Sequence, residues 1–179
     1  YGSWHNGIAA IECDPVTGKT LDDPWDVNSY TKIARRGIGQ NRWQGQEAPE
    51  ILYNDKTGKF YLFLAYDELM FRYNTRVCRG DSPNGNFFGI DGTNISTKTS
   101  RDLACYPILT HPYKFNNHVG WQGISHNAVY YDKDLDKWFY SSQGRLYGTG
   151  DDNIVYCMVM HIHEMVWTHG ESDDKYNGW

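Results

Sequence analysis

Apolar and aromatic positions are concentrated in several short stretches of the chain, and each stretch contains or runs into a compact polar turn. The stretches cover residues 7–13, 51–66 and 128–140. The turns are rich in Asp, Gly and Lys, and they begin at Asp14, Asp55 and Asp132. A strand, a turn of about five residues and a second aromatic strand predict a β-hairpin at each place.

The spacing of the three turns indicates a repeat. The intervals between their first residues are 55 − 14 = 41 and 132 − 55 = 77 residues. We interpret the second interval as two repeats, of which one is disguised. A period of about 40 residues built from strands is typical of a β-propeller. Serial hairpins also occur in β-sandwiches, so the spacing alone leaves both architectures open.

The rest of the chain adds strands and loops but no helix of ordinary length. Further strands are predicted at 74–79 and 154–166, with a strong turn signal at 80–86. Two polar segments, 21–45 and 93–117, read as irregular and are too long for hairpin turns. Loops of that size in a compact domain are usually functional or mobile. The prediction is an all-β protein.

Composition narrows the classes of partner. The net charge of −5 offers no basic surface, so nucleic acid is not an expected partner, and no apolar run is long enough to span a membrane. The four cysteines form no CxxC pair, which leaves zinc chemistry without support. Aromatic residues make up 16% of the chain, and aromatic platforms beside carboxylates are the usual components of sugar sites.

Glu47 is the first candidate for chemistry. It stands directly before the second hairpin, and Pro49 restricts the backbone that follows. In a propeller, strand starts of this kind converge on the central cavity, where a partly desolvated carboxyl group can protonate a leaving group near neutral pH. The alternative is an ordinary solvated acid in a loop.

Three histidines and an arginine are weaker candidates. His126 stands before the third hairpin, which we interpret as the position that Glu47 holds in the second; a hydrogen-bonded core histidine is the alternative to a metal ligand. His161 and His163 share one face of a predicted strand, either as a metal pair or as a polar face. Arg145 could hydrogen-bond sugar hydroxyls or a carboxylate.

Several segments in one order resemble the family 43 glycoside hydrolases of the arabinanase type. They are 1–8 with a Gly-Ser-Trp triplet, 47–49, 73–79, 82–85, 120–129 and 142–145. The resemblance runs from Tyr1 to about Trp167. It implies a five-bladed β-propeller that hydrolyses α-1,5-linked arabinan with inversion, using an Asp base, a second Asp that tunes the site, and a Glu general acid.

The resemblance also implies residue roles. Glu47 becomes the general acid, Ser3 a sugar contact with Trp4 as a neighbouring aromatic residue, and Arg145 a residue lining the reacting subsite. His126 becomes the histidine beside a central ion, which is calcium held mainly by water, or a chloride in its place. Arabinan or an arabino-oligosaccharide is the implied ligand, and the implied location is secreted, cell-surface or periplasmic.

The chain departs from the family pattern at both ends. Both family aspartates precede the Gly-Ser-Trp triplet, whereas this chain opens with Tyr1 and no Met. We therefore expect residues 1–179 to be a partial propeller domain of about three blades, inactive alone, with the other blades supplied by a companion polypeptide or by flanking sequence. An exo-acting arabinofuranosidase or β-xylosidase, and a non-catalytic carbohydrate-binding propeller, remain alternatives.

Overall fold

The computed structural model describes residues 2, 7–36, 45–97, 106–110, 112–113, 120–146, 158–168 and 178–179. Within these ranges the protein is built of strands and contains no helix. The strands are β1 (Ile8–Ala10), β2 (Thr31–Ala34), β3 (Gln46–Asn54), β4 (Lys59–Tyr66), β5 (Asn74–Gly80), β6 (Ile108–Thr110), β7 (Trp121–Asp132), β8 (Lys137–Leu146) and β9 (Met158–Met165). They form three antiparallel sheets in the orders β1-β2, β3-β4-β5-β6 and β7-β8-β9. The all-β prediction is confirmed.

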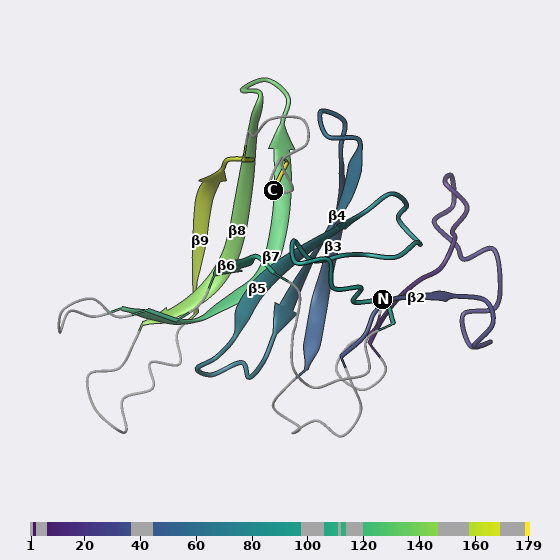
Figure 1. Ribbon diagram of the computed structural model, residues 1–179, viewed down its shortest axis with the longest axis horizontal. Helices are drawn as coiled ribbons and strands as arrows, with labels where there is room; N and C mark the ends of the chain where they lie inside the picture. Colours follow the sequence, from purple (N-terminus) through teal and green to yellow (C-terminus); the bar gives the residue numbers. More distant parts are fainter. Residues whose placement is uncertain are drawn as a thin grey trace.

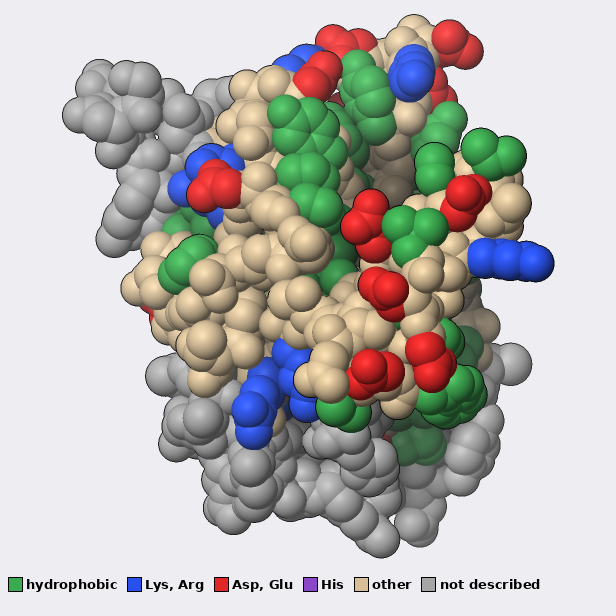
Figure 2. Space-filling model, turned by 90° about the vertical axis from the view of Figure 1, so that its right-hand side faces the viewer, with side chains coloured by type: hydrophobic (Ala, Val, Ile, Leu, Met, Phe, Trp, Pro, Cys, Tyr) green, Lys and Arg blue, Asp and Glu red, His purple; other side chains and the backbone are tan. Residues whose placement is uncertain are grey.

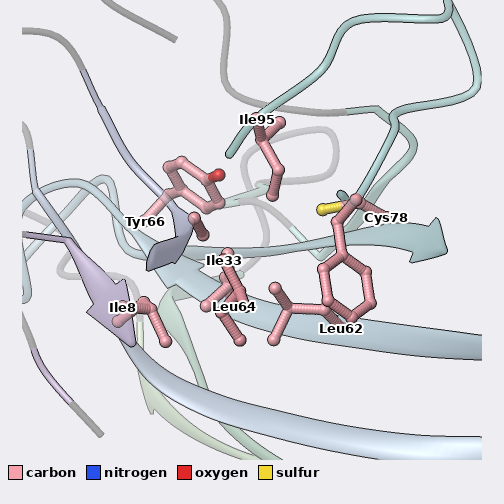
Figure 3. Close-up of a cluster of buried hydrophobic side chains, with 9 residues drawn as sticks. Ile8, Ile33, Leu62, Leu64, Tyr66, Cys78 and Ile95 are labelled. Atoms are coloured by element: carbon pink, nitrogen blue, oxygen red, sulfur yellow. The ribbon is translucent and has the colours of Figure 1, made fainter. Parts of the chain in front are cut away.

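The middle sheet is covered on both faces, and β4 shows why its sequence is almost continuously apolar (Figure 1). Leu62 and Leu64 pack toward β1 and β2, where they meet Ile33 in one buried cluster (Figure 3). Tyr61 and Phe63 point the other way, into a second cluster that includes side chains of β7 and β9. Because side chains alternate along a strand, a strand buried on both faces needs apolar residues at every position.

Among the described residues, the sheet β7-β8-β9 is covered on one face only. Tyr140 of β8 is buried against the middle sheet. On the opposite face Tyr130, Met160 and Ile162 are 63%, 71% and 59% exposed. Sheets that stack face to face, with an apolar outer face left at one end of the stack, are the arrangement of consecutive propeller blades.

The three predicted turns share one geometry. Side-chain oxygens of Asp14, Asn54 and Asp132 each accept a hydrogen bond from the backbone N–H two residues later, at 2.9, 3.0 and 2.9 Å. Equivalent positions of the last two hairpins therefore lie 132 − 54 = 78 residues apart. The intervening chain adds β5 and β6 to the same sheet as β3 and β4. The interpretation of this interval as two repeats is wrong, because one four-stranded sheet occupies it.

The two segments predicted as irregular each contain a short strand. β2 lies within 21–45 and β6 within 93–117. Strands of three or four residues are too short to show an alternating pattern, so only their partners, β1 and β5, define them. The strands expected at 74–79 and 154–166 are confirmed as β5 and, in its described part, β9.

On the face in Figure 2 the Lys and Arg side chains lie among acidic and uncharged ones. None of the described residues lies in a helix long and apolar enough to cross a membrane.

Candidate functional site

The first strand of each of the two larger sheets is bulged near its start. In β3 the pairing shifts between Glu47 and Glu50, and Ala48 has a φ of 48°. In β7 the pairing shifts between Ser125 and Ala128, and His126 has a φ of 57°. A positive φ is uncommon outside glycine, and a bulge re-aims side chains out of the regular pleat. Both candidate residues thus lie at the same kind of backbone irregularity.

The register corrects the equivalence expected from the sequence. With the 78-residue offset, Glu47 corresponds to Ser125 and His126 corresponds to Ala48. The expectation that His126 holds the position of Glu47 is wrong by one residue. The sequence carries a signal for the right alignment, because the triplet Trp-Gln-Gly occurs at 43–45 and again at 121–123 with the same offset.

Tyr73 joins the two bulges. Antiparallel pairing brings the start of β3, the end of β4 and the start of β5 to one end of the sheet, and Tyr73 directly precedes β5. Its fully buried side chain donates a hydrogen bond from Oη to Glu47 Oε1 at 2.6 Å, and the same oxygen lies 3.4 Å from His126 Nδ1. The structure therefore brings Glu47 and His126 together through a residue to which the sequence motifs assigned no role.

The protonation state of Tyr73 follows from its surroundings. Burial, and then the hydrogen bond and charge of Glu47, raise the pKa of Tyr73 far above its usual range. The phenol therefore keeps its proton at every physiological pH and acts as a permanent donor. Position before a strand start, which singled out Glu47, is the signal that could have identified Tyr73.

A buried set of hydroxyl groups lies beside this contact and connects the middle sheet to β7 and β8. Tyr140 donates to Thr75 Oγ1 at 2.7 Å, and Thr75 Oγ1 lies 2.8 Å from Ser125 Oγ. Thr110 Oγ1 accepts from the backbone N–H of Thr75 at 3.1 Å and donates to the carbonyl of Ile124 at 2.5 Å. Satisfied polar groups of this kind fix the relative position of two sheets, because breaking one leaves a buried group without a partner.

A second acid at this end of the sheet is neutralised by its neighbours. Asp67, with a φ of 71°, donates its backbone N–H to the carbonyl of Gly45. Its carboxylate accepts from Arg36 at 2.5 Å and from Asn74 at 2.9 Å, and Arg76 lies 3.8 Å away. Both carboxylate oxygens are thereby engaged by neighbouring side chains.

Arg145 lies on β8, paired with Gln122 of β7, and is buried. Its Nη1 lies 3.0 Å from Met70 Sδ, in the turn that leads from β4 to Tyr73. Arg145 is thus held against the same turn as Tyr73. Ser3 and Trp4 lie outside the described residues.

The described residues do not form a metal cage. In this part of the chain, no group of three or more His, Cys, Asp or Glu side chains converges. Ca²⁺ takes six to eight oxygen ligands, so the site at His126 fits calcium only with water as nearly all of its ligands. The rings of His161 and His163 stack with their centroids 6.0 Å apart. Burial, and then the charge of His163, lowers the pKa of His161. The ring of His161 also lies edge-on to Trp121, with the two centroids 4.3 Å apart.

Comparison with known proteins extends this picture. No family model matches the chain. It is 30% identical, over 93% of its length, to an extracellular endo-α-(1→5)-L-arabinanase of Thermotoga petrophila, and 26% identical over 93% to an extracellular endo-α-(1→5)-L-arabinanase 2 of Bacillus subtilis. The chain is a relative of the family 43 arabinanases.

Solved structures agree with this relationship. The chain superposes on the endo-1,5-α-L-arabinanase of Thermotoga petrophila with a TM-score of 0.73 and 28% identity over 93% of its length. The TM-score with a family 43 glycoside hydrolase of Bacillus licheniformis is 0.70, at 25% identity over the same share. The chain spans only 36% and 37% of the two curated relatives and 37% of each of these structures.

Proposed function

We propose that this chain is part of the catalytic domain of a glycoside hydrolase that degrades α-1,5-linked arabinan with inversion, with Glu47 as the general acid. The observation that carries the proposal is the half-buried carboxyl of Glu47, held at a bulge by the buried Tyr73 hydroxyl at 2.6 Å. A general acid needs a fixed carboxyl group at the leaving-group oxygen. The two curated relatives are endo-arabinanases, which supports arabinan as the substrate.

The other two acids of the reaction come from outside this chain in our proposal. An inverting hydrolase needs a base across the sugar ring, with the two carboxyl groups roughly 6.5–9.5 Å apart so that a water fits between them. Asp14 and Asp132 lie in hairpin turns, and Asp67 is engaged by arginines. The base and the tuning aspartate would therefore lie in other blades of the same propeller.

Contacts to the sugar are assigned to three further residues. Ser3 and Trp4 would contact the sugar near the reacting subsite, and Arg145 would line that subsite from β8. A central ion beside His126, calcium held mostly by water or a chloride, would complete the centre of the ring. Addition of a chelator should then lower both the rate and the melting temperature of a calcium-loaded protein, and a protein that responds in neither holds no divalent ion there.

The remaining architecture is proposed from the uncovered sheet face. The chain would supply about three blades of a five-bladed ring, and the apolar outer face of β7-β8-β9 would pack against the next blade. That blade would come from flanking sequence or from a companion polypeptide. Because the curated relatives are named as extracellular, we place the protein outside the cytoplasm, as a secreted or surface enzyme.

The central experiment replaces Glu47 by Gln in the complete protein, meaning this chain with all the blades of its ring. Glu47→Gln should lower kcat on arabinan about 10²- to 10⁴-fold while binding of arabino-oligosaccharides persists. Glu50→Gln, three residues along the same strand, is the matched control and should stay near the native rate. Unchanged hydrolysis in Glu47→Gln would remove Glu47 from the reaction, and a non-catalytic propeller would show no hydrolysis to lose.

A second experiment tests the division of the acids. Residues 1–179 alone should hydrolyse no arabinan, because they lack the base. Reducing-sugar release by this piece would refute the assignment of the base to other blades. Product analysis of the complete protein separates the two enzyme classes, since an endo-acting enzyme releases a range of oligosaccharides early and an exo-acting one releases a single short product.

A further inference from the structure

We propose that Tyr73 is the positioning residue of the general acid, and that its hydroxyl group holds the Glu47 carboxyl group in place through Oε1. This inference rests on the proposed role of Glu47 and deepens it. Its starting point is the Tyr73 hydroxyl group, which lies 2.6 Å from Glu47 Oε1 and 3.4 Å from His126 Nδ1.

The directions of the hydrogen bonds follow from the number of protons. A phenol has one proton to donate, and the shorter contact identifies Glu47 Oε1 as its acceptor. The remaining contact requires His126 to donate from Nδ1 to the Tyr73 oxygen. The tautomer of His126 with its proton on Nδ1 therefore completes a directed chain from β7 through Tyr73 to β3.

The consequence for catalysis concerns the position of the carboxyl group. Since the Tyr73 phenol keeps its proton, it donates to Glu47 Oε1 both before and after Glu47 gives up its own proton. In the reaction the carboxyl O–H bond breaks, the proton passes to the leaving sugar oxygen, and the carboxylate that forms keeps its hydrogen bond from Tyr73.

The placement of Tyr73 makes this a rigid device. The side chain is fully buried, so its ring has one orientation, and its backbone directly precedes β5, which is paired with β4 along its full length. The Glu47 end is bulged, with Ala48 at a φ of 48°, so its backbone direction is fixed as well. Positioning of a reacting group within a few tenths of an ångström is the kind of contribution that a second residue makes to catalysis.

The alternative is that Tyr73 is a core residue whose hydroxyl group only needs a hydrogen-bond partner. Substrates with different leaving groups distinguish the two roles. Cleavage between two sugars needs protonation of a poor leaving group, whereas a dinitrophenyl arabino-oligosaccharide releases a phenolate that needs none. A positioning residue affects the first substrate far more than the second. A structural residue affects both alike.

The experiment compares Tyr73→Phe with Tyr140→Phe in the complete protein on both substrates. Tyr140 is a buried tyrosine of the same region whose hydroxyl donates to Thr75 at 2.7 Å. Tyr73→Phe should lower kcat on arabinan about 10- to 100-fold at unchanged KM and change the dinitrophenyl substrate less than about twofold. Tyr140→Phe should lower stability and show no difference between substrates. Equal losses on both substrates for Tyr73→Phe, or no loss, would overturn the proposal.

Two further variants keep the outcome decisive. Glu47→Gln should show the same dependence on the leaving group. If Glu47→Gln shows this dependence and Tyr73→Phe does not, only the role of Tyr73 is refuted. If Glu47→Gln stays active on arabinan, the proposed function itself is refuted. Should Tyr73→Phe not fold, His126→Asn replaces it, because Asn tolerates a positive φ and withdraws the ring nitrogen. It should give a smaller loss, about two- to tenfold, again confined to arabinan, and an equal loss on both substrates would remove His126 from the chain of hydrogen bonds.

Discussion

The first strands of the two larger sheets, β3 and β7, have the same bulged backbone geometry but carry different side chains at the bulge. The bulge follows directly after Glu47 in β3 and after Ser125 in β7, and in each a non-glycine residue has a positive φ. At equivalent positions β3 presents Glu47 to Tyr73, whereas β7 presents Ser125 to a buried hydroxyl cluster. One strand supplies the candidate acid, and the other supplies the polar contacts that join the sheets.

This difference shows how a repeated fold creates a site. The bulge sets where a side chain points, and the residue at the bulge sets whether that position is used for reaction or for packing. Glu47 is half-buried and can reach a ligand, while Ser125 is fully buried. The same backbone irregularity therefore presents the candidate acid in one sheet and a buried contact between sheets in the next.

Exchanging the side chains of Glu47 and Ser125 should have the largest effects, one on stability and the other on hydrolysis. Ser125→Glu buries a carboxylate without a cation and should cost about 3 kcal/mol or more of unfolding free energy. Glu47→Ser should keep the fold within about 1–2 kcal/mol and abolish hydrolysis of arabinan. Urea denaturation and activity assays on both variants measure this. Similar losses of stability in both would show that the two positions are not as different as their burial indicates.

Gly123 tests a feature that lies just before the second bulge. It has a φ of 60°, and a Cβ there would stand 2.7 Å from the Leu69 carbonyl oxygen. Gly123→Ala should therefore lower the free energy of unfolding by about 2–4 kcal/mol, through both backbone strain and overpacking. Gly18 also has a positive φ, 68°, but has open space around it. Gly18→Ala is the control and should cost about 1 kcal/mol, so equal losses would mean that the contact with Leu69 relaxes freely.

Ser125→Ala isolates the hydrogen bond that joins the sheets. The change leaves the Thr75 hydroxyl group with one partner fewer and should cost about 1–2 kcal/mol of unfolding free energy, with little effect on kcat. Ser141→Ala is the matched change, since that hydroxyl makes only a long 3.5 Å contact with the Ala128 carbonyl. It should stay within about 0.5 kcal/mol. A neutral Ser125→Ala would show that water or a neighbouring hydroxyl replaces the lost group.

Ala48 gives the smallest expected effect and the sharpest test of the bulge. Glycine accepts a φ of 48° without strain, so Ala48→Gly should leave stability unchanged or raise it by up to about 1 kcal/mol. Ala65 on β4, which pairs with Glu47, has no such conformation. Ala65→Gly should cost about 1 kcal/mol or more through lost packing and greater freedom of the unfolded chain. In thermal melting, Ala65→Gly should lower the melting temperature and Ala48→Gly should not.

Strand content and candidate residues were readable from the sequence wherever the signal is local. The hairpins at 51–66 and 128–140 carry apolar and aromatic runs on both sides of a polar turn, and both are confirmed. Glu47 and His126 were singled out by their place before a hairpin. The short strands β2 and β6 were missed because three or four residues hold no period, and the 77-residue interval was misread because one four-stranded sheet occupies it.

The sequence by itself determined the all-β class, the long hairpins, the net negative charge and the likeness to family 43 arabinanases. Only the tertiary structure decided that Tyr73 lies between Glu47 and His126. The physical reason is that strand pairing and sheet stacking place residues 26 and 53 positions apart within hydrogen-bonding distance of one hydroxyl group. No local pattern of hydrophobic and polar residues encodes such a meeting.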